Sequence, residues 1–295
     1  MIGRDTTHLD TLSRPCSLNG FRPTLLDDLT RVGHKGDGGY VLNERSIRRT
    51  QYLMSFGIND DWSFELDFLQ RKPDTKVFCF DYSVSKSVFR GNMLSALNEA
   101  LSLKFALLVL SLNLSGARRK ISELRYWART YRRFSRFLSE KNVRFYDRGI
   151  SNEPNGQFLT FAEAFRVVSS DAVPEDSVFV KMDIEQSEFR VIPDLLRFER
   201  YINGMAIEFH DLDILWTRFV EVAKQLQAKF EITHIHGNNY GGLIPNSEIP
   251  RVLEITFLKK NLIREQLVAR ENVSYPLPEL DSPNNHREKD YRLSF

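Results

Sequence analysis

The sequence predicts an α/β protein with a doubly wound, mostly parallel, seven-stranded Rossmann-like sheet and an inserted basic helical segment. Short apolar runs alternate with helical patterns along most of the chain, which is typical of an open sheet with helices on both faces. Several runs are apolar at nearly every position, as expected for parallel strands covered on both sides. Polar residues that can do chemistry recur where these runs end, at the edge where such sheets bind ligands.

Composition narrows the class of protein. The chain has 295 residues, of which 42% are hydrophobic and 27% are charged, as in ordinary globular domains. Its two cysteines, Cys16 and Cys79, form neither a disulfide framework nor a metal-ligand pattern. The first residues lack the apolar core of a signal peptide, and the longest apolar run, 105–114, is too short to span a bilayer. We therefore expect a cytoplasmic protein, which could also bind peripherally at the inner face of the membrane.

The sequence divides into three parts. Residues 1–50 form a lead-in with a ligand-covering loop, 51–271 the main domain, and 272–295 a tail rich in proline and polar residues that wraps the surface. Within the loop, three glycines surround Asp37, and a strand begins at Tyr40. Asp-Gly is a strong turn signal, so spacing favours a hairpin turn. The alternative is a loop that folds over a ligand and supplies Lys35, Asp37 and Tyr40.

The first strand of the main domain covers 52–56 and leads through Gly57 and a polar turn into a helix that begins near Ser63. Such a turn leaves backbone N–H groups free to bind a ligand. A second strand, 77–80, ends in Asp81, at about the spacing from the glycine where ribose-binding folds place an acid. A plain strand–turn–helix connection remains the alternative for the glycine turn taken alone.

The inserted segment 86–141 interrupts this alternation. It contains 12 cations and 3 anions, a net charge of +9 that leaves −7 for the rest of the chain. Aromatic residues interleave with its arginines: Tyr126, Trp127, Tyr131, Phe134 and Phe137. Such a segment could lie on an anionic membrane surface, bind an acidic polymer, form a lid or a contact between copies of the chain, or be a solvated helix face. No nucleic-acid recognition motif accompanies the charge.

Five further strands follow, at 143–149, 177–182, 204–209, 230–236 and 252–258, with helices at 160–168, 188–200 and 212–229 between them. Three of the strands end in paired polar residues. The candidate catalytic residues are Asp183, Glu185, Glu208, His210 and His236. Residues two apart lie on one side of a strand, and the ends of parallel strands meet at one edge, so these side chains should converge.

Three stretches resemble the FkbM family of class I S-adenosylmethionine-dependent methyltransferases. They are Ser55-Phe-Gly-Ile-Asn-Asp-Asp-Trp-Ser-Phe-Glu, with an upstream Asp-Gly-Gly-Tyr-Val, then Lys181-Met-Asp-Ile-Glu-Gln-Ser-Glu, and Gly204-Met-Ala-Ile-Glu-Phe-His with His-Ile-His-Gly-Asn-Asn. The resemblance covers 31–258 apart from the insertion. The chain departs from the family pattern at Gln186, where the family has glycine, and in the single glycine of the first motif.

The resemblance implies a set of contacts to S-adenosylmethionine. Gly57 and Asn59 would approach its methionine and adenosine parts, Asp81 would hold the ribose hydroxyls, and Ile150 and Ser151 would lie beside the adenine. Asp183 would lie near the sulfonium and the acceptor. The full implied set is Lys35, Asp37, Gly39, Tyr40, Phe56, Gly57, Ile58, Asn59, Trp62, Ser63, Asp81, Tyr82, Ile150 and Ser151.

The resemblance also implies methyl transfer to an oxygen, on a glycan or glycolipid acceptor. An alcohol needs a base within hydrogen-bond reach, and Asp183, His210 and His236 are the candidates. A divalent metal on Asp183, Glu208, His210 and His236 is an alternative that we do not favour. Two rival functions stay open: a metal-dependent hydrolase that uses the acid and histidine residues, and a non-catalytic scaffold that binds an anionic partner through 86–141. A homo-oligomer is compatible with each.

Overall fold

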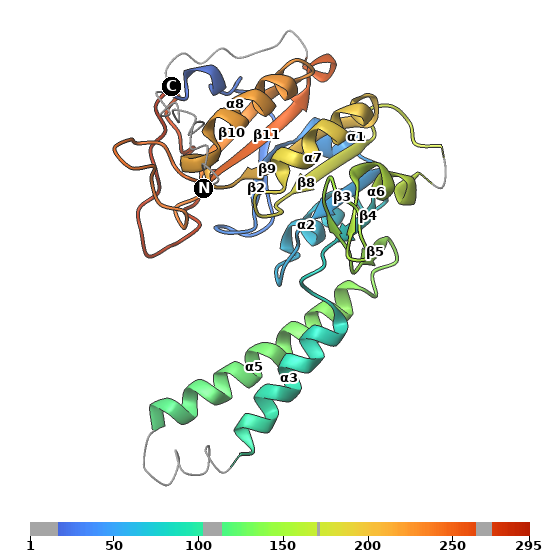
Figure 1. Ribbon diagram of the computed structural model, residues 1–295, viewed down its shortest axis with the longest axis vertical. Coiled ribbons are helices and arrows are strands. Elements are labelled where there is room, and N and C mark those ends of the chain that lie inside the picture. The colour runs from blue at the N-terminus through green and yellow to red at the C-terminus, as the bar shows by residue number, and fades with distance from the viewer. Residues whose placement is uncertain (1–16, 103–113, 170–171, 264–272) are drawn as a thin grey trace, which may run out of the picture.

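The computed structural model describes residues 17–102, 114–169, 172–263 and 273–295. Its centre is a seven-stranded sheet with the order β10-β11-β9-β8-β3-β4-β5 (Figure 1). The strands are β3 (Tyr52–Phe56), β4 (Lys76–Phe80), β5 (Val143–Tyr146), β8 (Val178–Met182), β9 (Ile202–Phe209), β10 (Phe230–Gly237) and β11 (Leu253–Lys259). Only β11 is antiparallel to its neighbours within this sheet. The predicted doubly wound sheet is therefore confirmed.

Strand order creates a switch point between β3 and β8. The chain runs outward from β3 through β4 to β5, then returns to the other side of β3 with β8 and continues to β9. The connections on the two sides leave the carboxyl edge in opposite directions, which opens a crevice there. Gly57, Asp81, Asp183 and Glu208 all stand at or just beyond this edge.

Helices cover both faces of the sheet, as the alternation of buried side chains along each strand requires. One core packs β3 and β8 against α6 (Phe161–Val168), α7 (Glu188–Leu195) and α8 (Leu212–Gln227). The opposite core packs them against α1 (Glu44–Arg49) and α2 (Ser63–Arg71). Met54 belongs to the first core and its neighbour Leu53 to the second. Helix α2 begins at the predicted residue, and Thr160 caps α6 through a capping box with Glu163.

The loop around Asp37 joins two paired strands. β1 (Leu29–Val32) and β2 (Tyr40–Asn43) are antiparallel, so the hairpin interpretation is confirmed. Arg31 fixes the connection, because its guanidinium donates to the carbonyls of His34, Gly36 and Gly39. Asn284 in the tail donates to Asp37 at 3.2 Å. The loop is held in place by these contacts, and its role as a ligand-covering lid stays a prediction.

Two predicted elements differ from the observed ones. The strand expected at 143–149 ends at Tyr146, and the chain then forms β6 (Gly149–Ile150), which pairs with β7 (Phe158–Leu159) in a separate small sheet. A side chain at Gly149 would meet the Phe158 ring at 2.5 Å, so the glycine permits this close pairing. The helix expected at 188–200 ends at Leu195 and continues as a 3₁₀ turn over Leu196–Tyr201. Apolar periodicity alone does not distinguish the two helix types.

The described residues of the insertion include the helices α3 (Lys86–Ala100) and α5 (Leu114–Phe137), which lie side by side and project from the body of the molecule (Figure 1). We call this hairpin the arm. At its base, Trp62 packs against Phe134 and Phe137, with ring centroids 5.2 and 5.7 Å apart, and against Phe89 at 6.2 Å. Trp62 is only 1% exposed. Its expected place as a wall of the cofactor site is therefore wrong, because the arm's aromatic residues enclose it.

The tail lies over β10 and β11. Asp281 contacts His234 at 3.1 Å, Asp290 contacts His236 at 3.0 Å, and Asn284 donates to Glu254 at 2.6 Å. A tail placed on the surface agrees with the sequence prediction, but these buried polar contacts were not foreseen. Among the described residues, no helix is long and apolar enough to cross a membrane.

Candidate functional site

A cavity of about 310 Å³ opens at the switch point. This size falls at the lower end of the range of ~300–1,000 Å³ usual for small-molecule sites. Residues from the ends of β3, β4 and β8 and from β6 surround it. The lining residues are Gly57, Asn59, Phe80, Asp81, Tyr82, Ser83, Gly149, Ile150, Phe158, Asp183, Ile184, Glu185 and Ser187.

Gly57 brings the turn after β3 against the turn after β8. Its φ is +74°, and a Cβ there would lie 1.7 Å from the carbonyl oxygen of Asp183. Only glycine fits both conditions. The buried ammonium of Lys181 donates to the Gly57 carbonyl and lies 3.6 Å from the Asp183 carboxylate. One lysine thus ties together two turns that both line the cavity.

Asp81 holds the turn after β3 in shape. Its Oδ2 accepts from the backbone N–H groups of Ile58 and Asn59, both at 2.9 Å. Its Oδ1 accepts from the N–H of Ser83 at 2.7 Å and from the Ser83 hydroxyl at 2.6 Å. A carboxylate offers about four acceptor positions, and these are filled. The Ser83 hydroxyl can rotate away, so a ligand hydroxyl could replace it on Asp81.

The wall beside Asp81 is largely apolar. The Tyr82 ring lies 4.8 Å from the ring of Phe158, and Ile150 is buried next to them in the lining. Tyr82 is 49% exposed, so one ring face is open to solvent. An apolar wall next to a hydrogen-bonding carboxylate suits a ligand that combines a flat ring with hydroxyl groups.

On the β8 side, Asp183, Glu185 and His210 come together. The Nε2 atom of His210 lies 3.7 Å from Asp183 Oδ1 and 3.7 Å from Glu185 Oε2. One ligand atom from each residue lies within 4.8 Å of the others. This spacing could admit a divalent cation, for which two carboxylates and an imidazole are suitable ligands. Asp183 and Glu185 line the cavity, whereas His210 is not one of its lining residues.

Glu188 orients the His210 ring. Its buried Oε1 lies 3.0 Å from His210 Nδ1 and also accepts from the Ile184 N–H at 3.1 Å. Nε2 therefore faces the carboxylates of Asp183, Glu185 and Glu208. Burial alone would lower the pKa of His210, but the Glu188 hydrogen bond and the charges of Glu208 and Asp183 raise it to about 10. Burial also raises the pKa of Glu188 itself.

Glu208 is buried beneath this group. It accepts from the Tyr40 hydroxyl at 3.2 Å and from the Asn238 side chain at 2.8 Å, and its Oε1 lies 3.6 Å from His210 Nε2. Burial and the negative charges of Asp183 and Glu254 raise the pKa of Glu208 well above its ordinary value. Its contacts are thus internal to the protein.

His236 does not join the predicted cluster. Strand β11 lies between β10, which carries His236, and β9, after which His210 follows. The ring of His236 is held between Glu254 at 3.1 Å and Asp290 at 3.0 Å. The predicted four-residue metal set is therefore wrong as a group. Asp183 and His210 do come together, but the exposed carboxylate beside them is that of Glu185, whereas Glu208 is buried and His236 lies elsewhere.

The cavity includes some of the expected cofactor contacts. Five residues line it: Gly57, Asn59, Asp81, Tyr82 and Ile150. The other nine lie outside its described lining: Lys35, Asp37, Gly39, Tyr40, Phe56, Ile58, Trp62, Ser63 and Ser151. Phe56 is fully buried in the sheet core, and Ser63 bonds with Asp61. Ile58 acts through its backbone N–H, which Asp81 binds.

Sequence reasoning missed several residues of the site. Ser83 and Phe158 line the cavity, and Glu188 positions His210. Glu188 was visible as the last acid of the motif that begins at Lys181, one helical turn beyond Ile184. Phe158 gave no signal, because its place depends on the pairing of two short strands.

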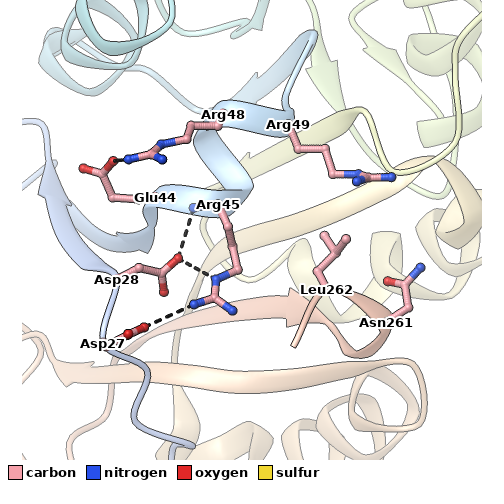
Figure 2. A pocket seen from close by; sticks show the side chains of 8 residues that line it. All are labelled: Asp27, Asp28, Glu44, Arg45, Arg48, Arg49, Asn261 and Leu262. Atoms are coloured by element: carbon pink, nitrogen blue, oxygen red, sulfur yellow. Dashed lines mark hydrogen bonds and ion pairs between the residues drawn. The ribbon is translucent and has the colours of Figure 1, made fainter. Parts of the chain in front are cut away.

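A second hollow, of about 750 Å³, lies between α1 and the chain that follows β11 (Figure 2). Its lining residues are Asp27, Asp28, Glu44, Arg45, Arg48, Arg49, Asn261 and Leu262. Arg45 pairs with Asp28 at 2.6 Å and Arg48 with Glu44 at 3.0 Å. Its charges largely neutralise one another, and we assign it no chemistry.

No protein-family model matches the chain, and no curated protein is significantly similar to it in sequence. Solved structures with a related arrangement include precorrin-6y C5,15-methyltransferase from Geobacter metallireducens GS-15, with a TM-score of 0.34, 11% identity, and coverage of 74% of this chain and 86% of that one. The Methanococcus jannaschii fibrillarin pre-rRNA processing protein has a TM-score of 0.35 and 11% identity, and the match covers 82% of this chain and 86% of that one. Aeropyrum pernix fibrillarin with natively bound S-adenosyl-L-methionine has a TM-score of 0.34 and 9% identity, and the match covers 77% of this chain and 82% of that one. Because these TM-scores are low, we infer function from the site's own residues.

Proposed function

We propose that this chain is an S-adenosylmethionine-dependent O-methyltransferase that acts on a sugar hydroxyl of a cell-surface polysaccharide or its lipid-linked precursor. One observation carries the proposal. Asp81, the Gly57 turn and Asp183 all line the one cavity at the switch point. A nucleoside-type ligand held by Asp81 and the Gly57 turn would therefore lie in the same cavity as Asp183. The resemblance of the stretch from Lys181 to Glu188 to the FkbM signature supports the same chemistry.

The cavity residues fit the parts of this cofactor. Ile150, Phe158 and Tyr82 offer an apolar wall for the adenine, and Asp81 with Ser83 offers hydroxyl partners for the ribose. The turn at Gly57 and Asn59 would accommodate the amino-acid part. S-adenosylmethionine, when bound, supplies a methyl group on a positively charged sulfur. Asp183 would favour that positive charge by proximity.

Asp183 is the best-placed of the three candidate proton acceptors, because it lines the cavity whereas His210 and His236 do not. Asp183 would accept the proton that an acceptor hydroxyl loses when it takes the methyl group that the bound cofactor would supply. His210, fixed by Glu188, would orient the carboxylate. A divalent cation on Asp183, Glu185 and His210 would instead lower the pKa of a coordinated hydroxyl.

Calorimetry and transfer assays test the proposal together. Wild-type protein should release heat on binding S-adenosylhomocysteine and should transfer labelled methyl groups from S-adenosylmethionine to a lipid-linked glycan fraction. Asp183→Asn should bind the cofactor product within a few-fold of wild type, but lose ~10²–10⁴-fold in transfer rate. The exposed Glu153 provides the matched control, since Glu153→Gln removes a nearby carboxylate outside the cavity lining. Absence of S-adenosylhomocysteine binding would refute the assignment.

The group of Asp183, Glu185 and His210 favours a metal-dependent hydrolase as the second candidate function. The two candidates give opposite results in one pair of measurements. A hydrolase would bind Mn²⁺, cleave a phosphate ester or a glycosidic bond only in its presence, and show no heat with S-adenosylhomocysteine. A methyltransferase that uses Asp183 as its base would keep full activity after exhaustive chelation.

A further inference from the structure

The arm exposes two ordered stripes of side chains. On α5, Arg118, Arg125, Arg129, Arg132 and Arg136 are all exposed. Their spacings of seven, four, three and four residues place them on one face of a helix. The opposite face holds the buried Thr130, Phe134 and Phe137. The stripe runs along a helix of 24 residues, or ~36 Å.

The far end of the arm is apolar on its outer surface. On α3, Leu94 and Leu97 are 43% and 37% exposed, and Leu101, which caps the helix, is 77% exposed. They follow one another at three and four residues, so they share a face. At the start of α5, Leu114 is 55% exposed. Leu101 and Leu114 thus stand at the helix ends that lie away from the sheet (Figure 1), and Leu94 and Leu97 lie in the second half of α3.

We propose that the arm docks on an anionic phospholipid surface, with the arginine stripe on the headgroup phosphates and the leucines in the interface. A basic stripe combined with aliphatic side chains at one end matches the two layers of such a surface. A nucleic acid would use the arginines but would leave the leucines in water. This proposal does not depend on methyl transfer.

The arm also contacts the loop of the candidate site. The Tyr126 hydroxyl donates to the Asp60 carboxylate, and Trp62 packs between the arm and the body. Asp60 follows Asn59, which lines the cavity. The guanidinium of Arg133 lies 5.6 Å from the centre of the Trp62 ring. The base of the arm therefore contacts the loop that also contributes Asn59 to the cavity.

Vesicle sedimentation tests the proposal with the full chain. The protein should bind vesicles of phosphatidylcholine in which about a third of the lipid is phosphatidylglycerol. It should not bind vesicles of pure phosphatidylcholine. Raising the salt should weaken binding. A triple variant, Arg125→Gln with Arg129→Gln and Arg132→Gln, should partition at least about tenfold less, because each basic residue near such a surface contributes about fivefold. A second triple variant, Leu94→Ser with Leu97→Ser and Leu101→Ser, should also lose at least about tenfold.

The matched control removes three exposed arginines from helices of the body, through Arg166→Gln, Arg190→Gln and Arg218→Gln. It should bind vesicles as wild type does. Vesicle binding that is unchanged in the α5 triple variant would overturn the proposal. So would tighter binding to single-stranded RNA than to phosphatidylglycerol vesicles at equal salt, or a dimer that the leucine variant dissociates in the absence of vesicle binding.

Discussion

The Oε1 atom of Glu188 lies 3.0 Å from Nδ1 of His210, and this contact leaves Nε2 of the ring facing the carboxylates of Asp183 and Glu208. Glu188 is fully buried at the start of α7 and His210 follows the end of β9. A helix residue that does not line the cavity therefore fixes the orientation of the ring.

Glu188→Gln should lower methyl transfer by ~10–100-fold, as is usual when the partner that orients a functional histidine is changed. S-adenosylhomocysteine binding should stay within a few-fold of wild type. NMR of the imidazole nitrogens should show an altered His210 environment. Glu221→Gln on the exposed surface of α8 is the control. A variant with unchanged histidine signals and full activity would contradict the positioning role.

Gly57→Ala should destabilise the protein by more than about 3 kcal/mol, because the positive φ costs about 1–3 kcal/mol and the methyl group would also displace the Asp183 carbonyl. Denaturant unfolding measures the loss. Two controls separate its causes. Gly242 has a φ of +76° but open space around it, and Gly156 has open space without the positive φ. If Gly242→Ala costs as much as Gly57→Ala, close packing of the two turns is not the main constraint.

Stability should depend on His236 at alkaline pH. Burial would lower the pKa of His236, but hydrogen bonds with Asp290 and Glu254 and the charge of Asp281 raise it from 6.5 to about 10. A raised pKa means that the contribution is complete below about pH 6.5 and is lost as the pH rises through 10.

Thermal unfolding, measured at pH values from about 6 to about 10.5, tests this dependence. Asp290→Asn should lower the Tm at pH 6.5, and the difference from wild type should shrink toward pH 10. Asp147→Asn, at an exposed position, should give no difference at either pH. A constant Tm difference across the range would show that His236 and Asp290 contribute through packing alone.

Phe134→Ala should destabilise the base of the arm by ~3–5 kcal/mol, the usual effect of removing a buried aromatic ring. Phe134 is fully buried and contacts Trp62, Phe89 and Phe145. Hydrogen exchange should show faster exchange in α3 than in the rest of the chain. Tyr240→Ala, at a residue that is 63% exposed, should change stability by less than about 0.5 kcal/mol.

The sheet could be predicted from the sequence because each strand has a local signal, a short apolar run with a recognisable end. The run from Val178 to Met182 is apolar at four of its five positions, and Gly57 and Asp81 mark the ends of their strands. The convergence of Asp183 with His210 followed from the rule that parallel strands end at one edge. The pair lies 3.7 Å apart, as that rule required.

The position of His236 could not be predicted in this way. The sequence of its strand resembles that of the other strands. However, β11, which follows β10 in the sequence, lies between β9 and β10 in the sheet. Trp62 was misplaced for a related reason. An aromatic residue after a glycine turn can face a cavity or a core, and its partner Phe134 lies 72 residues further on, in a helix whose packing the sequence did not reveal.

The place of the arm in the chain has a consequence for folding. The arm joins β4 to β5, two strands that pair at the edge of the sheet although about 60 residues separate them. Closing so long a loop costs more entropy than closing a short one, whereas each helix of the arm forms from contacts within its own turns. A helical hairpin that forms first would bring the two strand ends together. We expect pulse-labelled refolding to protect the amides of α3 and α5 before those of β5.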